Sequence, residues 1–418
     1  MAKDTIIVGG SIAGLMCGIM LKHHGYNVTI FEKEPSKSRE GYNAGIKIGP
    51  DVQDFLKKHS RVPRDFTITC KAPVKFNIDG KAKPEHKQTM TSTSWGLLVS
   101  ILRADFDGLT SKAVPIAPKA EERDGNAVFR NGAKVTDVRD FGNSVQVDVE
   151  DATSHNIQTV SGDLVIVADG STSTLRKILL PDVKRQYAGY VSWRGTVQEA
   201  AVDKQASQTY AEKFAFHLMD RNYILHYTIP TDDGNVDPGK RLHNWIWYQP
   251  LAEKSEGMNA IFTDMNGIRH HGTVPRGLLE PKVWEQQKSL ASATMPTDLA
   301  QILHSTSAPF VCTIYDLLSP RSVFFGGKVL LVGDALTTIR PNAGMSTTHA
   351  AYNCNELEKM IEGKQTPYQW EKAVLSFGAA QQRFAMVIAS FGLDSKLVMV
   401  WYTIRWLLLL LGQKLGLA

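Results

Sequence analysis

The chain has 418 residues, of which 43% are hydrophobic, and a formal charge of +5 at pH 7, so it is long enough for two domains or one large interleaved domain. The small positive charge is spread along the chain and gives no support for nucleic-acid binding. The four cysteines lack metal or redox spacing and no secretory signal is found, so we expect a reduced intracellular protein without a metal site, either cytoplasmic or peripherally associated with a membrane.

The start of the chain has the pattern of a dinucleotide-binding βαβ unit. It consists of an apolar strand, a glycine-rich turn, a helix and a second strand, at Thr5–Val8, Gly9–Gly14, Leu15–His24 and Val28–Phe31. Gly9 allows a tight turn, Gly14 allows the helix to pack close to the strand, and the helix N-terminus can bind a pyrophosphate. Glu32 follows at roughly the 20-residue distance expected for an acid that binds a ribose hydroxyl. Ser11 occupies the place of the second glycine of this fingerprint.

Two later segments place an aspartate at the carboxyl end of an apolar strand, where ligands of open α/β sheets bind. The strand Leu164–Ala168 is followed by Asp169, and the strand Lys328–Val332 by Gly333 and Asp334. Each carboxylate can accept a hydrogen bond from a ribityl or ribose hydroxyl. The loop Pro341–Ser346 then opens a helix, whose N-terminal N–H groups can face the electron-rich end of a flavin ring. Each segment alone is also compatible with a strand and an Asx turn.

Residues 181–300 have a different pattern. Four β-rich, aromatic segments are expected to be strands: Tyr187–Val197, Lys213–His217, Ile224–Ile229 and His243–Tyr248. The turn-forming segment Thr231–Asn235 separates two of them. We therefore expect a second β sheet, inserted into the first domain, before the chain ends in helices.

The segment Leu397–Leu411 is apolar except for Thr403 and Arg405. It is shorter than the roughly 20 residues that a membrane-spanning helix needs, and Arg405 lies in its middle. Its apolar residues surround the helix, which predicts burial on all sides by protein or by lipid. Because Trp401 and Trp406 flank the arginine, we expect a helix that docks on the protein or contacts a membrane peripherally, and not a spanning anchor.

In this order and at these separations, the segments resemble the class A FAD-dependent monooxygenases, which have the para-hydroxybenzoate hydroxylase-like fold. Within that class the chain resembles in particular the 2,6-dihydroxypyridine 3-monooxygenase-like group and its fungal relatives. The motifs that carry the resemblance are Gly9–Leu15, Arg39–Gly41, Ala44–Ile46, Ser94–Leu98, Leu102–Ala104, Tyr190–Gly195 and Arg340–Pro341. The resemblance covers nearly the whole chain.

The resemblance implies an α/β architecture, with a Rossmann-like FAD-binding domain, an inserted β-sheet substrate domain and C-terminal helices. The expected parts are an FAD-binding domain at 1–180 with a minor substrate-domain segment at about 76–94, a β-rich substrate domain at 181–300, the second part of the FAD-binding domain at 301–365, and a helical region at 366–418. Asp334 would bind the ribityl chain, and Gly344 would lie beside the isoalloxazine. Non-covalent FAD is expected to contact Gly9, Ser11, Ile12, Ala13, Gly14, Glu32, Lys33, Arg39, Gly45, Arg103, Asp169, Asp334, Pro341, Gly344 and Met345.

The implied activity is an NAD(P)H- and O₂-dependent monooxygenation through a C4a-hydroperoxyflavin. Only one glycine-rich fingerprint is present, so NAD(P)H is expected to bind transiently as the reductant. The substrate is expected to be an electron-rich aromatic or heteroaromatic molecule of phenol, hydroxypyridine or indole type, such as specialised metabolism uses. Arg194 can stabilise developing negative charge, unless it pairs with a structural carboxylate. His226, Tyr227 and Tyr248 are candidate proton donors, and each is also compatible with a core role.

Two features leave other functions open. Many class A enzymes carry a histidine soon after the Gly-Asp pair and another after the proline, whereas this chain has Leu336–Thr338 and Asn342. A flavin-dependent oxidase and a non-catalytic FAD-binding module therefore remain alternatives. The segment Trp245–Pro250 is similar to the WxWxIP signature of flavin-dependent halogenases, although alternating tryptophans also indicate one face of a sheet.

Overall fold

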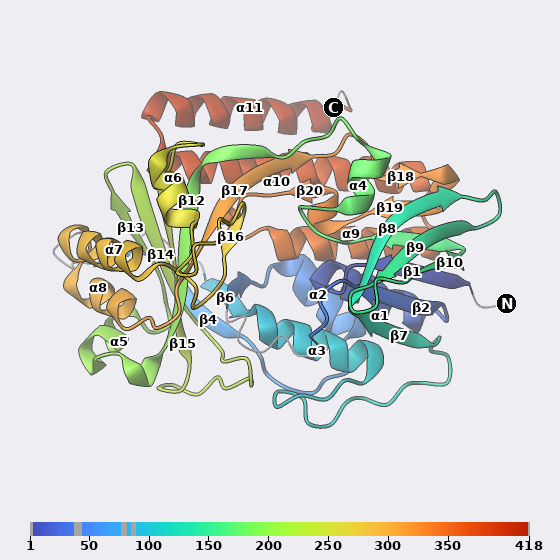
Figure 1. Cartoon of the computed structure of the whole chain (residues 1–418), viewed down its shortest axis with the longest axis horizontal. Helices are drawn as coiled ribbons and strands as arrows, with labels where there is room; N and C mark the ends of the chain where they lie inside the picture. Colours follow the sequence, from blue (N-terminus) through green and yellow to red (C-terminus); the bar gives the residue numbers. More distant parts are fainter. Residues whose placement is uncertain (1–2, 37–43, 77–81, 85–88, 417–418) are drawn as a thin grey trace.

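The structure, a computed structural model, describes residues 3–36, 44–76, 82–84 and 89–416. Its strands form a six-stranded sheet, a three-stranded sheet and an 11-stranded mixed sheet. Figure 1 shows the six-stranded sheet near the N-terminus, the large sheet at the opposite side of the molecule, and the long helix α10 extending across both. The expected fold class, an α/β Rossmann-like domain with a second sheet and C-terminal helices, is confirmed.

The six-stranded sheet contains the N-terminal βαβ unit. Its strands, in order across the sheet, are β18 (Val323–Phe324), β19 (Val329–Leu331), β11 (Leu164–Val167), β1 (Asp4–Val8), β2 (Asn27–Glu32) and β7 (Ala127–Asn131). All neighbouring strands are parallel except β18 and β19. β11 and β19 are buried along their whole length, as expected for parallel strands that are covered on both faces. The strands predicted before both aspartates are therefore confirmed.

Helices and a small sheet cover the six-stranded sheet. The helices are α1 (Ile12–His23), α2 (Pro50–His59), α3 (Trp95–Asp107), α4 (Thr174–Leu179) and α9 (Ser346–Ile361), and the small sheet consists of β8 (Ala133–Asp140), β9 (Val145–Asp151) and β10 (Ile157–Gly162). Helix α1 contacts both α3 and α9. This packing buries the apolar side chains of α1 except that of Ala13, which is partly exposed, and fixes the N-terminus of α1 at the carboxyl end of β1.

The large sheet collects strands from distant parts of the chain. In order they are β16 (Thr273–Val274), β17 (Phe310–Leu318), β12 (Gln186–Gln198), β15 (Leu242–Pro250), β14 (Asn222–Ile229), β13 (Lys213–Met219), β4 (Ile68–Phe76), β6 (Thr89–Ser94) and β3 (Gly45–Lys47), with β20 (Thr337–Thr338) paired to β17 and β5 (Ala82–Pro84) to β4. The four strands predicted between 187 and 248 are confirmed. The segment from the first part of the chain is longer than the expected 76–94, because β3 and most of β4 precede it.

The large sheet is buried on both faces in its centre. One face packs against helices that the sequence pattern did not reveal: α5 (Lys204–Tyr210), α6 (Glu256–Phe262), α7 (Pro281–Thr294) and α8 (Thr297–His304). On this face the ring of Trp245 stacks on Trp284, with centroids 6.0 Å apart. The alternating Trp245 and Trp247 thus form part of an ordinary hydrophobic core. This agrees with the interpretation that alternating tryptophans indicate one face of a sheet.

Two helices close the chain. α10 (Pro367–Leu393) contacts elements of both sheets, and α11 (Lys396–Lys414) packs along α10 (Figure 1). The predicted docking of the terminal helix is confirmed by the ring contact of Phe384 with Trp406, whose centroids are 5.1 Å apart. The predicted burial on all sides is wrong, because no residue of α11 is buried. In the described part of the chain, no helix combines the length and the apolar character that a membrane crossing requires.

One buried ion pair ties the loop before α9 to the large sheet. The Arg340 Nη2 atom lies 2.6 Å from Asp316 Oδ2, and Arg340 Nε donates to both carboxylate oxygens at 2.9 and 3.0 Å. The Arg340 guanidinium also lies 5.6 Å from the ring of Tyr190. Because Asp316 lies on β17 and Arg340 directly precedes Pro341, the pair fixes the position of that loop against the sheet.

We expect Asp316→Ala to lower the free energy of unfolding by about 3–5 kcal/mol, because it leaves the Arg340 guanidinium buried without its counterion. Chemical denaturation measures this loss. Asp237→Ala is the matched control, since it breaks the exposed ion pair with Lys240 and such pairs contribute little. Equal midpoints for Asp316→Ala and the unmodified protein would show that the pair does not hold the loop.

Candidate functional site

The glycine-rich turn after β1 is shaped by two close backbone approaches. Gly9 has φ +102°, and a Cβ atom there would lie 2.4 Å from the carbonyl oxygen of Ala168. A Cβ atom on Gly14 would lie 1.9 Å from the carbonyl oxygen of Gly9. Neither position tolerates a side chain, so the start of α1 is held against the ends of β1 and β11. This is the geometry predicted for the dinucleotide fingerprint.

The first turn of α1 has N–H groups available to an anionic ligand. Ser11 is the N-cap residue but its side chain makes no capping hydrogen bond, and no acidic residue lies in the first turn. The N–H groups at a helix N-terminus bind phosphate and similar anions. The residues here therefore fit the pyrophosphate of FAD, with Ile12 and Ala13 in the first turn of the helix.

A cavity opens beside this turn, at the carboxyl ends of β1, β2 and β11. Its volume is about 240 Å³. It is lined by Val8, Gly9, Ser11, Phe31, Glu32, Lys33, Ala133, Lys134, Val135, Ala168, Asp169, Gly170, Thr172 and Thr174. The structure thus brings together five residues that the sequence predicted for cofactor binding, from three segments of the chain.

The two predicted acids of this cavity are held by backbone N–H groups. Glu32 Oε2 accepts a hydrogen bond from Gly10 N–H at 2.8 Å, and Glu32 Oε1 accepts one from Glu34 N–H at 3.0 Å. Asp169 Oδ2 accepts one from Thr174 N–H at 2.8 Å, and burial raises the pKa of this carboxyl. Both side chains are therefore fixed at the cavity before any ligand binds.

The Gly333–Asp334 turn follows β19 and lies beside the start of α1. A Cβ atom on Gly333 would lie 2.8 Å from the Cβ atom of Ala13, so this turn abuts the start of α1. Burial raises the pKa of Asp334 to about 6, while the nearby Arg176 guanidinium acts in the opposite direction. Arg176 is buried and donates to the carbonyl oxygens of Ala335 and Ser171. Asp334 thus lies next to the predicted pyrophosphate site.

The loop Pro341–Gly344 connects this region with the large sheet. Asn342 accepts a hydrogen bond from the Tyr190 hydroxyl at 2.6 Å and donates one to the Tyr223 hydroxyl. Gly344 has φ +63°, and a Cβ atom there would lie 3.2 Å from that of Lys47. Pro341, Gly344 and Met345 therefore lie between the helix α9 that they open and the strands of the large sheet.

The sheet face that meets this loop carries tyrosines and one arginine. Tyr223, Tyr227 and Tyr248 lie on it, with the rings of Tyr223 and Tyr248 5.0 Å apart. Arg194 points to the same face, since its charge acts on the Tyr227 and Tyr248 hydroxyls. Burial raises the pKa of both tyrosines, so they stay protonated at neutral pH. The Tyr248 hydroxyl is buried and has no hydrogen-bond partner among the described residues.

Arg194 makes one hydrogen bond in the structure, from Nε to Ser192 Oγ at 3.2 Å. Among the residues that the structure describes, no carboxylate forms an ion pair with it. A second guanidinium, that of Arg276, interacts with it electrostatically, stacks over the Phe310 ring at 4.7 Å and donates to Thr196 Oγ1. The geometry therefore favours a cation that faces a ligand over one that neutralises a structural acid.

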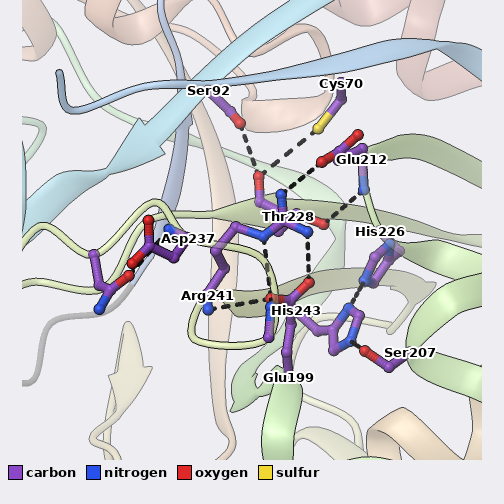
Figure 2. Close-up of polar contacts among 12 residues, drawn as sticks. Cys70, Ser92, Glu199, Ser207, Glu212, His226, Thr228, Asp237, Arg241 and His243 are labelled. Carbon is purple, nitrogen blue, oxygen red and sulfur yellow. Dashed lines mark hydrogen bonds and ion pairs between the residues drawn. The ribbon is translucent and has the colours of Figure 1, made fainter. Parts of the chain in front are cut away.

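The structure separates His226 from the other candidate proton donors. His226 lies on the opposite face of β14, where its Nε2 atom is 2.9 Å from His243 Nδ1, and His243 Nε2 is 3.0 Å from Ser207 Oγ (Figure 2). Burial lowers the pKa of both histidines, that of His243 to about 4. Figure 2 also shows the adjacent buried ion pair of Arg241 with Glu199. This cluster stabilises the packing of α5 on the sheet and is remote from the tyrosine face.

The remaining predicted residues have different surroundings. Arg103 forms two hydrogen bonds with Asp107 and stacks 3.5 Å from the centroid of Phe129, a ring that borders the glycine turn at Gly10. Gly45 N–H donates to Asn244 Oδ1 at 2.9 Å, on the tyrosine face. Arg39 lies outside the described residues.

Several residues of the site were not predicted. Tyr223, Lys47 and Arg276 have no motif of their own and are found only when the strands are assembled. Tyr190 belongs to the motif Tyr190–Gly195, but no role was predicted for its hydroxyl. Asn342 carried a signal, since the resemblance leads us to expect a histidine after Pro341. It marked the loop correctly, although its two contacts to tyrosines depend on the fold.

The comparisons with known proteins agree with this geometry. Residues 7–38 match the family described as an NAD(P)-binding Rossmann-like domain, and residues 187–316 match the family described as FAD binding domain-like. The chain is 28% identical to 2,6-dihydroxypyridine 3-monooxygenase of Paenarthrobacter nicotinovorans over 356 residues, which cover 85% of this chain and 81% of that protein. It is 28% identical to 6-hydroxynicotinate 3-monooxygenase of Pseudomonas fluorescens over 364 residues, covering 82% and 78%.

The fold has a close counterpart among solved structures. The structure of 2,6-dihydroxypyridine-3-hydroxylase from Arthrobacter nicotinovorans superposes with a TM-score of 0.79 at 24% identity and covers 94% of both chains. It shows the same fold. Sequence, fold and the geometry of the glycine turn together confirm the expected resemblance, and the chain is an FAD-dependent monooxygenase, an oxidoreductase with a Rossmann-like FAD-binding fold.

Proposed function

We propose that this monooxygenase uses NAD(P)H and O₂ to hydroxylate an electron-rich aromatic or heteroaromatic small molecule of phenol, hydroxypyridine or indole type. One observation carries the proposal. The loop Pro341–Gly344 lies between the predicted cofactor cavity and a sheet face that carries Tyr227, Tyr248 and Arg194. The loop would hold the flavin ring, Asp334 would bind the ribityl chain, and the sheet face would bind the substrate.

Non-covalent FAD would be held by groups already in place. The first turn of α1 would bind the pyrophosphate, and Glu32 would bind a ribose hydroxyl. Asp169 and Asp334 would lie near the chain that connects the flavin ring with the adenosine part of FAD. When bound, FAD supplies electron transfer from NAD(P)H and the activation of O₂. The protein contributes orientation, proton donors and exclusion of water.

The charges of the tyrosine face support a substrate with an ionisable hydroxyl. Arg194 places a positive charge at this end of the sheet, whereas the charge of Arg276 acts together with that of Asp232, and Tyr227 and Tyr248 remain neutral. A fixed guanidinium stabilises an ionised hydroxyl, and ionisation of a ring hydroxyl makes the ring more electron-rich. The buried Tyr248 hydroxyl can donate a hydrogen bond to such a ligand. By their names, both curated relatives act on hydroxylated pyridines, which agrees with this chemistry.

Halogenation receives no support from the geometry. Trp245 and Trp247, which resemble part of the halogenase signature, point away from Arg194 into the core under α7. They therefore have no access to a substrate on the tyrosine face.

The proposal is tested by turnover of the FAD-loaded protein with a phenol, a hydroxypyridine and an indole series, with NADH and NADPH as alternative reductants. We expect one of these series to accelerate NAD(P)H consumption and to give a product that carries one oxygen atom from isotopically labelled O₂, detected by mass spectrometry. Hydrogen peroxide without an oxygenated product from every series would indicate an oxidase instead.

Arg194→Ala should lower coupled product formation about 10²- to 10³-fold, since it removes a preorganised cation that faces developing negative charge. Arg194→Lys should recover part of this rate, because the charge remains but the planar fork is lost. FAD content, measured by absorbance, should not change. Arg123→Ala, at an exposed arginine, is the control. Full coupled activity of Arg194→Ala would assign this residue to the scaffold.

Asp334→Asn should weaken FAD binding by about 1.5–3 kcal/mol, because a charged acceptor is lost. In the apoprotein the pKa of Asp334 is raised to about 6, so the carboxylate becomes protonated as the pH falls from 7 to 5. We therefore expect FAD affinity to fall over this range in the unmodified protein and in the exposed control Asp182→Asn. The dependence should be shallower in Asp334→Asn. Titration of the apoprotein with FAD measures both effects, and an unchanged affinity would exclude Asp334 from the site.

A further inference from the structure

The terminal helix α11 presents a continuous apolar face to the outside of the molecule. Leu397 is 82% exposed, Leu408 61% and Trp401 57%. The exposed large apolar residues of this face, named here the α11 stripe, are Leu397, Val400, Trp401, Ile404, Leu407, Leu408, Leu411 and Leu415. They recur every three or four residues, so the 3.6-residue repeat places them on one side of the helix.

The opposite side of α11 is fixed to the protein. Trp406 contacts Phe384 of α10, and Gln413 Nε2 donates to the carbonyl oxygen of Ser376 at 2.9 Å. Arg383 donates to the carbonyl oxygen of Arg405 at 2.9 Å. The α11 stripe is therefore held outward by contacts of the helix between Arg405 and Gln413, and the exposed face is not a consequence of a detached tail.

Positive charges border the α11 stripe. Lys396 and Lys414 lie at its two ends on one edge, and Arg405 lies on the other edge, 5.8 Å from the ring of Trp401. The helix contains no acidic residue, and Asp394 precedes it in the turn after α10. Leucine and tryptophan on one face with lysine and arginine beside them are the composition of a helix that lies in a membrane interface.

We propose that the α11 stripe docks the enzyme on an anionic lipid bilayer, with α11 parallel to the membrane plane. The apolar side chains would enter the boundary between headgroups and acyl chains, and Lys396, Arg405 and Lys414 would contact lipid phosphates. Trp401 favours this depth, since tryptophan is enriched at membrane interfaces.

The same charges disfavour a second copy of this chain as the occupant. A two-fold symmetric pairing of α11 with itself in antiparallel orientation would place Lys396 of one copy near Lys414 of the other. Like charges at such short separations repel each other, and the helix has no acid to compensate them. An anionic surface supplies the missing counterions.

The test is flotation of the FAD-loaded full chain with vesicles of pure phosphatidylcholine or of phosphatidylcholine with about one third phosphatidylglycerol, at low and high salt. We expect the protein to float with the anionic vesicles and to be released from them partly by salt, because both apolar burial and charge contribute. Binding to the neutral vesicles should be at least several-fold weaker.

Two double variants separate the contribution of apolar burial from that of charge. Ile404→Gln with Leu408→Gln should abolish flotation, whereas the matched control of Ile116→Gln with Ile157→Gln, at apolar residues exposed elsewhere, should not. Lys396→Glu with Lys414→Glu should remove the preference for anionic vesicles, and the control Lys204→Glu with Lys282→Glu should keep it. Flavin absorbance and NAD(P)H consumption without vesicles should be unchanged, which shows that each variant is folded.

Three results would overturn the proposal. The first is a chain that remains unbound with both kinds of vesicle. The second is flotation that the Ile404→Gln with Leu408→Gln variant retains in full. The third is a light-scattering mass of a dimer that this variant converts to a monomer, which would make the α11 stripe an interface between copies. None of these results depends on which substrate the enzyme oxidises.

Discussion

The ion pair of Arg340 with Asp316 is the contact on which the arrangement of the site depends. It joins Arg340, the residue directly before the loop Pro341–Gly344, to β17 of the large sheet, and both side chains are nearly buried. Burying two charges costs a large desolvation free energy, which a well-aligned pair offsets without much net gain. Its value here is geometric, because the fork of the guanidinium fixes the direction in which the chain enters Pro341. The Tyr190–Asn342 hydrogen bond then holds the next residue of the loop to the same sheet.

A second constraint is the close packing of backbone around the start of α1. Gly9, Gly14 and Gly333 each approach a neighbouring segment too closely for a side chain. They bring the ends of β1, β11 and β19 to one point, where the helix N-terminus and the predicted acids can act on one ligand. In the proposed function, the ion pair would position the loop beside the flavin end of that ligand, and the glycines would position the helix N-terminus at its phosphates.

The sequence predicted the strands, the glycine-rich turn and the helix start around the cofactor cavity, because the signals for these elements are local. A turn that needs glycine, an acid after an apolar strand and a helix start can each be recognised within about ten residues. The residues of the tyrosine face could not be predicted in the same way. Tyr227 and His226 are adjacent, and every residue of β14 from Tyr223 to Ile229 is buried, so no difference in polarity shows which face meets the cofactor. Only the register of β14 with β15 and the packing of α5 assign His226 to the other side.

The prediction that the terminal helix is buried on all sides was wrong for a related reason. Its composition is apolar almost throughout, and composition does not show how much of a helix the body of the protein covers. α10 covers one side of α11 through Phe384 and Ser376, and the remaining side chains stay outside.

Asn342 follows Pro341 at a position where the resemblance leads us to expect a histidine, and this amide affects how protons can move near the loop Pro341–Gly344. An amide does not titrate, and this one accepts the Tyr190 hydrogen and donates to the Tyr223 oxygen. The Tyr190 hydrogen is thereby engaged, while the Tyr223 and Tyr248 hydrogens remain for other acceptors. Burial keeps these tyrosines protonated, so they can orient a bound hydroxyl but release a proton poorly. In the proposed function, stabilisation of an ionised substrate would then fall to Arg194, the cation of this face that has no carboxylate counterion among the described residues.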